Sequence, residues 1–161
     1  RLVIGSFSAA SNVTGVRAEV DAVTEQLHRA GALACWDYAT AGPYAEVDMN
    51  PVRFSSSSSS SSSSGQRLEQ QQAPLALNPW VYKDAVFLSM HKFPGGMGCP
   101  GVLVAKKRLF RNAVPTQPGG GTVFFVTDQD HRYLSNREER EEGGTQDLVG
   151  AVRAGLVMHL R

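Results

Sequence analysis

The first 39 residues alternate between two apolar segments and one segment of helical periodicity, and this pattern limits the folds open to the chain. "RLVIGSF" and "ALACWDYA" are rich in apolar and β-branched residues and are bounded by small or polar ones, which predicts two buried strands. Between them apolar residues recur at helical spacing: Val16, Val20, Val23 and Leu27. Gly31 is a suitable C-terminal stop for that helix. Strand, helix and strand joined by short connections predict an α/β fold, with a mainly parallel sheet and helices on both faces.

The composition says more about which partners the chain can bind than about its fold. With 16 basic and 15 acidic residues among 161, the net charge is +1, so neither nucleic acid nor an anionic membrane surface is expected as a partner. No segment has the eighteen or so apolar residues that a membrane helix needs. Cys35 and Cys99 form neither a disulfide framework nor a zinc-ligand spacing, which predicts two free thiols, no metal site and an intracellular location, cytoplasmic or organellar.

The middle of the chain interrupts this pattern. Ser55 to Ser64 form a run of ten serines, and the polar sequence around them predicts a disordered surface insertion at about residues 54–77. Three more strands are predicted beyond it, in "DAVFLSM", "GVLVAKKRLF" and "TVFFV". The last segment predicts a helix with Thr145 as candidate N-cap. Its apolar side consists of Leu148, Val149, Val152, Leu156 and Leu160.

Polar side chains follow each of the first three main-sheet strands. Ligands of open α/β sheets bind beyond the carboxyl ends of the strands, so these side chains are the candidate site. They are Ser11, Asn12 and Thr14 after the first strand, Asp37 with Tyr38, Ala39 and Thr40 after the second, and Ser89, His91 and Lys92 after the third. His28, His131 and His159 are isolated in the sequence and receive no role.

A lysine at such a strand end can form a Schiff base with a carbonyl group when its amine is neutral. Pyridoxal 5'-phosphate is one carbonyl partner, and it also needs a carboxylate at its pyridine nitrogen, a small residue against its ring and donors for its phosphate. Asp37 and Ala39 are candidates for the first two needs. For the phosphate the candidates are Ser89, His91 and the helix N-terminus at Thr145.

Four segments carry a resemblance to a known family: "SNVTG", "DYA", "FLSMHKF" with the glycine-rich turn after it, and "EEGGTQD". In order and spacing they resemble the class V aminotransferase and cysteine desulfurase family of pyridoxal phosphate (PLP) enzymes. The resemblance implies part of the large domain of a fold type I PLP-dependent transferase. Residues 1–161 would then be a partial PLP-binding domain, with the small C-terminal domain absent. The start at "RLVIGSF", without methionine, also indicates a fragment.

The family pattern implies a role for each matching residue. Lys92 would be the Schiff-base lysine, Asp37 the partner of the pyridine nitrogen, and Ser89 and His91 phosphate ligands. Asn12 would contact the substrate carboxylate or the cofactor. Thr145 would reach the phosphate of the other subunit's cofactor in a homodimer with shared active sites. The substrate would be an amino acid, and both transamination and carbon–sulfur cleavage remain open.

Two positions depart from the family pattern. Thr40 stands where the family commonly has a glutamine that bonds the ring hydroxyl. Cys99 lies in the loop after Lys92, so we do not interpret it as a sulfur-accepting nucleophile.

Two alternatives to a complete PLP enzyme stay open. The chain could be a catalytically incomplete fragment or pseudoenzyme that retains the fold. It could also be a Schiff-base enzyme without cofactor, such as an aldolase, although Asp37 and the Gly-Gly-Thr segment would then have no explanation. At the level of single residues, Lys92 could be a solvated loop lysine, Asp37 a turn residue and Thr145 a plain helix cap.

Overall fold

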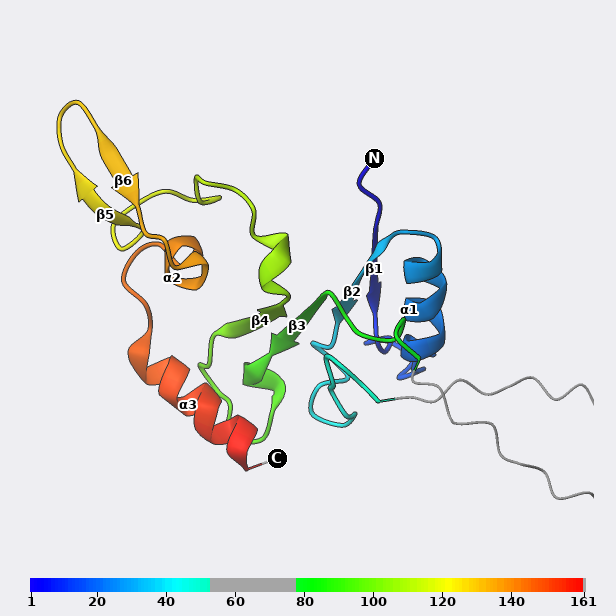
Figure 1. The fold of residues 1–161 in the computed structure, drawn as a ribbon. Helices are drawn as coiled ribbons and strands as arrows, with labels where there is room; N and C mark the ends of the chain where they lie inside the picture. Colours follow the sequence, from blue (N-terminus) through cyan, green and yellow to red (C-terminus); the bar gives the residue numbers. More distant parts are fainter. Residues whose placement is uncertain (53–77, 161) are drawn as a thin grey trace, which may run out of the picture.

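The structure is a computed structural model, and it describes residues 1–52 and 78–160. The insertion predicted at about residues 54–77 lies outside the described residues. The elements follow in the order β1 (Ile4–Ser8), α1 (Val20–Arg29), β2 (Leu33–Asp37), β3 (Ala85–Ser89), η1 (Met90–Lys92), β4 (Gly101–Ala105), η2 (Lys107–Leu109), β5 (Val123–Val126), β6 (His131–Tyr133), α2 (Arg137–Glu141) and α3 (Leu148–His159) (Figure 1).

Strands β1 to β4 form one sheet in that order. The pairs β1–β2 and β2–β3 are parallel, and β4 runs antiparallel to β3. Ser8 is opposite Asp37, and Asp37 is opposite Phe87, so the first three strands end at the same edge of the sheet. The predicted mainly parallel α/β sheet is confirmed.

Helix α1 covers one face of the sheet. Trp36 points toward it and donates its indole N–H to the Thr24 hydroxyl over 2.8 Å, and both side chains are fully buried. The helix begins at Val20, four residues later than its first predicted apolar position. The reason is the bridge between Ala10 and Arg17, which holds the preceding residues extended and leaves Val16 exposed.

The opposite face of the sheet is open among the described residues. Because side chains alternate along a strand, this face carries the residues that α1 does not cover. Ile4, Phe87 and Leu103 are each about half exposed on it. Among the described helices, α1 lies on the other face of the sheet. Helix α3 packs against η1 at the end of the sheet (Figure 1).

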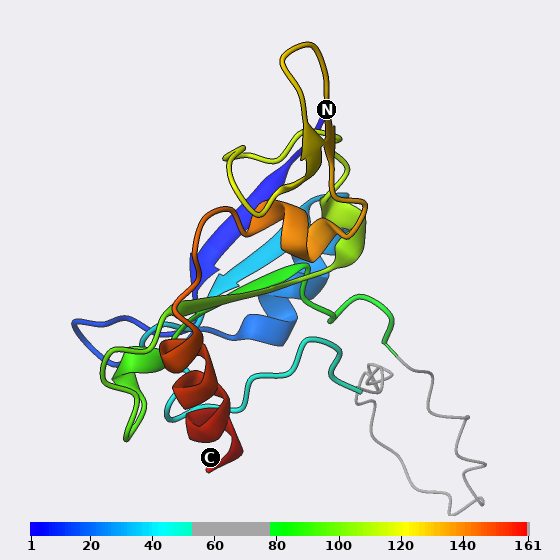
Figure 2. The same cartoon turned by 90° about the vertical axis from the view of Figure 1, so that its left-hand side faces the viewer.

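The C-terminal third folds as a hairpin followed by two helices. Strands β5 and β6 are antiparallel, and both views show this hairpin projecting beyond the four-stranded sheet (Figures 1 and 2). "REEREE", interpreted from sequence as a solvated face or turn, forms the short helix α2, which Asn136 caps by accepting from the Glu138 N–H. Arg140 of this helix is buried, and it donates to the carbonyls of Leu134 and Asn112.

Helix α3 is buried on a different side from the one predicted. Its apolar stripe, from Leu148 to Leu160, is mostly exposed, whereas Gly150, Ala154 and Val157 are buried against the segment that follows β3. A Cβ at Gly150 would lie 2.1 Å from Asp147 Oδ2 and 3.0 Å from Pro100 Cδ, so a side chain does not fit at this position without movement. Among the described residues, no helix is long and apolar enough to cross a membrane.

Candidate active site

The predicted site residues of β2 and β3 lie at one edge of the sheet and on one side of it. Asp37 is the last residue of β2 and Ser89 the last of β3. Asp37 pairs with Phe87, two residues before Ser89, so Asp37 and Ser89 point to the same face. That face is opposite to α1, because Trp36 points toward α1 and its neighbour Asp37 points away.

Asp37 is exposed and oriented by its own backbone. Its Oδ1 accepts a hydrogen bond from the Ala39 N–H over 2.6 Å, a local turn that fixes the carboxylate at the strand end. Among the described residues Oδ2 has no hydrogen-bond partner, so one carboxylate oxygen is available to a ligand. The next residue, Tyr38, is buried on the other side, and burial raises the pKa of its phenol.

The lysine lies on a short 3-10 turn with buried ends. Met90 is fully buried and Phe93 nearly so, and the Phe93 N–H donates to the Met90 carbonyl over 3.1 Å. His91 and Lys92 lie between these two anchors and are both exposed. Ser89 is partly buried, and its side chain makes no capping hydrogen bond to η1. The hydroxyl, the imidazole and the amine therefore lie within four consecutive residues at the end of β3 and in η1.

The glycine-rich turn after Lys92 folds back over η1. The Gly96 N–H donates to the Phe93 carbonyl over 2.9 Å, and a Cβ at Gly96 would lie 1.9 Å from the Met90 oxygen. No residue with a side chain fits at position 96 without moving one of the two segments. Gly95 and Gly98 adopt φ values of 81° and 75°, a region that glycine enters without steric cost.

Helix α3 supports this turn along its buried face. Val157 Cγ2 lies 3.8 Å from the Cβ position of Gly95, and Pro100 Cδ lies 3.0 Å from that of Gly150. Cys99 is buried in the same segment as a free thiol. Sequence reasoning missed this support. Gly150 and Ala154, small residues one helical turn apart, were the signal that could have indicated it.

Asn12 lies at the same sheet edge, in the loop that follows β1. Ser11 organises this loop, since its Oγ accepts from the N–H groups of Val13 and Thr14, each over 3.2 Å. Asn12 is exposed at the turn. The loops after all three parallel strands therefore each contribute one exposed polar side chain or more.

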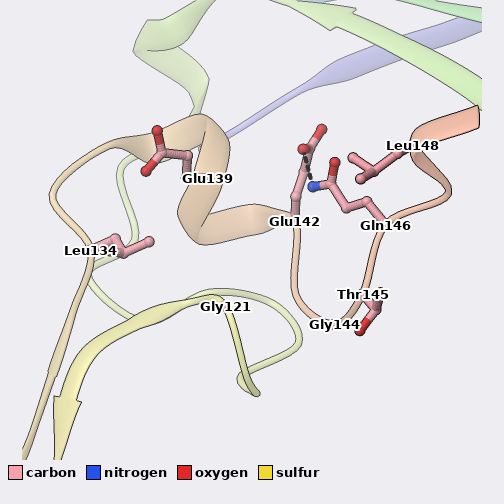
Figure 3. Close-up of a pocket in the computed structure, with 8 residues that line it drawn as sticks. All are labelled: Gly121, Leu134, Glu139, Glu142, Gly144, Thr145, Gln146 and Leu148. Carbon is pink, nitrogen blue, oxygen red and sulfur yellow. Dashed lines mark hydrogen bonds between the residues drawn. The ribbon is translucent and has the colours of Figure 1, made fainter. Parts of the chain in front are cut away.

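Thr145 lies elsewhere, in the linker between α2 and α3, and it is not the N-cap of α3. Asp147 caps the helix by accepting from the Gly150 N–H over 2.9 Å, because the helix begins only at Leu148. Thr145 is exposed and borders an open depression of about 310 Å³ (Figure 3). The depression lies between the loop at Gly121, helix α2 and the turn in which Gln146 donates to Glu142.

Residues 81–160 match the family model described as "Aminotransferase class-V". This part of the chain belongs to the class V aminotransferase family. The resemblance inferred from the sequence is thus confirmed. The class V aminotransferase segment spans β3, η1 and α3, and so contains Ser89, His91, Lys92 and Thr145.

Two solved structures share the fold over 98% of this chain. One is the cysteine desulfurase CsdA from Escherichia coli, with a TM-score of 0.69 and 21% identity. The other is a cysteine desulfurase from Thermococcus onnurineus, with a TM-score of 0.70 and 23% identity. The chain covers 32% of each of them, so it spans about a third of their length. No curated protein matches the chain in sequence.

The side chains at the sheet edge fit the needs of pyridoxal phosphate. An exposed amine, a carboxylate with one unbonded oxygen and two further polar side chains lie where parallel strands end. Lys92 would hold the aldehyde carbon, Asp37 the pyridine nitrogen, and Ser89 and His91 the phosphate. Ala39, partly buried beside Asp37, is small enough to lie against a planar ring.

Proposed function

We propose that this chain forms the cofactor-binding part of a PLP-dependent enzyme that acts on an amino acid. One observation carries the proposal: Asp37 is exposed at the end of β2 and Lys92 is exposed just after β3, the adjacent parallel strand, and these are the two groups that PLP chemistry needs most. The membership of residues 81–160 in the class V aminotransferase family supports it independently of that geometry.

Lys92 and Asp37 have different proposed roles in the reaction. Lys92 would hold the cofactor through its amine, and the same amine, when free, would remove or return the proton at the substrate Cα. Asp37 would hold the pyridine nitrogen with its carboxylate and keep it protonated. When bound, PLP supplies the electron-withdrawing ring that stabilises negative charge at that carbon.

The remaining polar groups bind and orient. Ser89, at the end of β3, and His91, in η1, would hold the phosphate, and Ala39 would lie against the ring. Asn12 contacts the substrate carboxylate or the cofactor from the loop after β1. Thr145, in its separate linker, serves the phosphate site of a second subunit in a homodimer. The chain as a whole is part of a fold type I large domain.

The test is to locate the covalent link. The full-length protein that contains this chain is incubated with PLP, reduced with borohydride and mapped by peptide mass spectrometry. We expect the pyridoxyl group on Lys92, with the visible absorbance band lost on reduction. Lys92→Ala should abolish both signals, whereas the control Lys107→Ala, an exposed lysine in η2, should keep them. Labelling of another lysine, or none, contradicts the proposal.

Two readouts separate the alternatives. A protein that links PLP at Lys92 and turns over no amino acid is the incomplete fragment or pseudoenzyme. A protein that traps a keto substrate on Lys92 and binds no PLP is a Schiff-base enzyme without cofactor. Transamination is distinguished from desulfuration by supplying an amino acid with a keto acid, or cysteine, and measuring the new amino acid or the released sulfide.

A further inference from the structure

A hydrogen bond from α3 holds the turn that follows the lysine. Arg153 Nη1 donates to the Met97 carbonyl over 2.6 Å. A hydrogen bond from a charged donor is stronger than one between neutral groups. Arg153 lies one helical turn from Gly150 and Val157, on the side of α3 that supports the glycine-rich segment.

Within the turn, the Cys99 N–H donates to the Gly96 carbonyl over 3.0 Å, but Met97 itself has little else to fix its position. The Met97 side chain is 82% exposed and gives no packing anchor. Gly98, which follows it, and Gly95, just before Gly96, both have positive φ and carry no side chains. Because glycine backbone is the least restricted, contacts from outside the turn add to the order that its own hydrogen bonds give it. Arg153 supplies a polar contact of this kind.

A shift of the turn would reach the residues on either side of His91 and Lys92 by two direct contacts. The Gly96 N–H bonds the Phe93 carbonyl, one residue after Lys92. The Gly96 backbone also lies against the Met90 carbonyl, so closely that no Cβ fits between them. The two buried residues that flank His91 and Lys92 are thus both in contact with the turn that Arg153 holds.

We propose that Arg153 is a positioning residue, which holds Lys92 in place for its link to the cofactor by fixing the Met97 carbonyl. This inference rests on the proposed function of Lys92. Nothing in it requires Arg153 to touch the cofactor or the substrate. Its effect should therefore appear in how readily Lys92 takes up PLP and in how well the turn is ordered.

The experiment compares three variants of the full-length protein. Arg153→Met removes the donor and keeps most of the length, and Arg153→Lys restores a cationic donor. Arg137→Met is the matched control, because Arg137 is also an exposed helical arginine that donates to a backbone carbonyl, that of Lys107, over 2.8 Å. PLP affinity is measured from the visible band, Lys92 labelling by borohydride reduction, and order by hydrogen exchange at Gly96 and Cys99.

We expect Arg153→Met to weaken PLP binding about tenfold and to speed exchange at Gly96 and Cys99 by a similar factor. Arg153→Lys should restore much of both, and Arg137→Met should change neither. Should Arg153→Met not fold, Arg153→Gln, which loses the charge but keeps a short amide donor, replaces it in the same comparison.

Three results would overturn the inference. Unchanged PLP affinity in Arg153→Met, with wild-type labelling at Lys92, rejects the positioning role and leaves the proposed function standing. An equal loss in Arg137→Met shows general destabilisation and also rejects it. Absence of wild-type labelling at Lys92 rejects the proposed function, and this inference with it.

Discussion

The carboxylate of Asp84 accepts a hydrogen bond from His28 Nε2 over 2.9 Å, which joins the start of β3 to the last turn of α1. Asp84 is fully buried and also accepts from the Ala34 N–H and from Arg108. The opposite ring nitrogen of His28 bonds the Trp80 carbonyl over 2.7 Å. These contacts lie at the opposite end of the strands from the candidate site, and they fasten the helix to the sheet.

Replacing this buried carboxylate should destabilise the fold. Asp84→Asn removes the charge from the bonds to His28 and Arg108. The amide N–H group of the asparagine would also face a donor group of one of these residues. We therefore expect a loss of about 3 kcal/mol in the free energy of unfolding. Urea unfolding measures it. Asp128→Asn, in the exposed turn between β5 and β6, is the control and should change the free energy by less than about 0.5 kcal/mol.

The same carboxylate predicts a pH dependence with a definite sign. Burial alone would raise the pKa of Asp84, but hydrogen bonds from Ala34, His28 and Arg108 outweigh it and hold the pKa below its ordinary value of 3.8. A lowered folded-state pKa contributes stability that is fully present above the ordinary value and is lost as the pH falls through the folded value. The stability gap between wild type and Asp84→Asn should therefore narrow below about pH 4. A constant gap would contradict this.

The buried pair of Trp36 and Thr24 gives a second stability prediction. Thr24→Val keeps the shape of the side chain but leaves the indole N–H without its acceptor in the core. An unsatisfied buried donor costs about 1–3 kcal/mol, which we expect as the loss in unfolding free energy. The exposed Thr116→Val is the control. Equal effects in the two variants would show that the bond contributes nothing.

Gly96 should tolerate no side chain. In Gly96→Ala the new Cβ would meet the Met90 oxygen at 1.9 Å, so the glycine turn or η1 must move, at a cost of about 1–3 kcal/mol. We also expect weaker PLP uptake at Lys92, measured by borohydride labelling. Gly120→Ala is matched, because no atom lies within 4 Å of its Cβ position and its φ is not positive. It should behave as wild type in both measurements.

Asp37→Asn should lower the catalytic rate and leave the stability of the fold unchanged. The asparagine Oδ1 can still accept from the Ala39 N–H, so the unfolding free energy should change by less than about 0.5 kcal/mol. The loss of the charge facing the pyridine nitrogen should slow the proposed reaction by about a hundredfold. Asp48→Asn is the control, since Asp48 makes the same local bond, to the Asn50 N–H over 2.8 Å. Unchanged turnover in Asp37→Asn would remove Asp37 from the proposed mechanism.

The amino-acid sequence was sufficient to predict the mainly parallel sheet and the family, because both depend on patterns within short segments of the chain. Alternating apolar segments define strands, and parallel strands must end at one edge, so the sequence is enough to assign Asp37 and Ser89 to that edge. The roles of these residues toward PLP remain predictions.

Only the tertiary structure decided which face of α3 is buried and which residues fasten the core. Periodicity indicated the stripe from Leu148 to Leu160, yet the buried residues are Gly150, Ala154 and Val157, because this side of α3 packs against the segment after β3, where Pro100 Cδ leaves no room for a Cβ at Gly150. His28 had no role in the sequence, because Asp84 is 56 residues away and nothing local marks the pair. Local patterns fix the elements, whereas contacts between distant residues depend on how those elements pack.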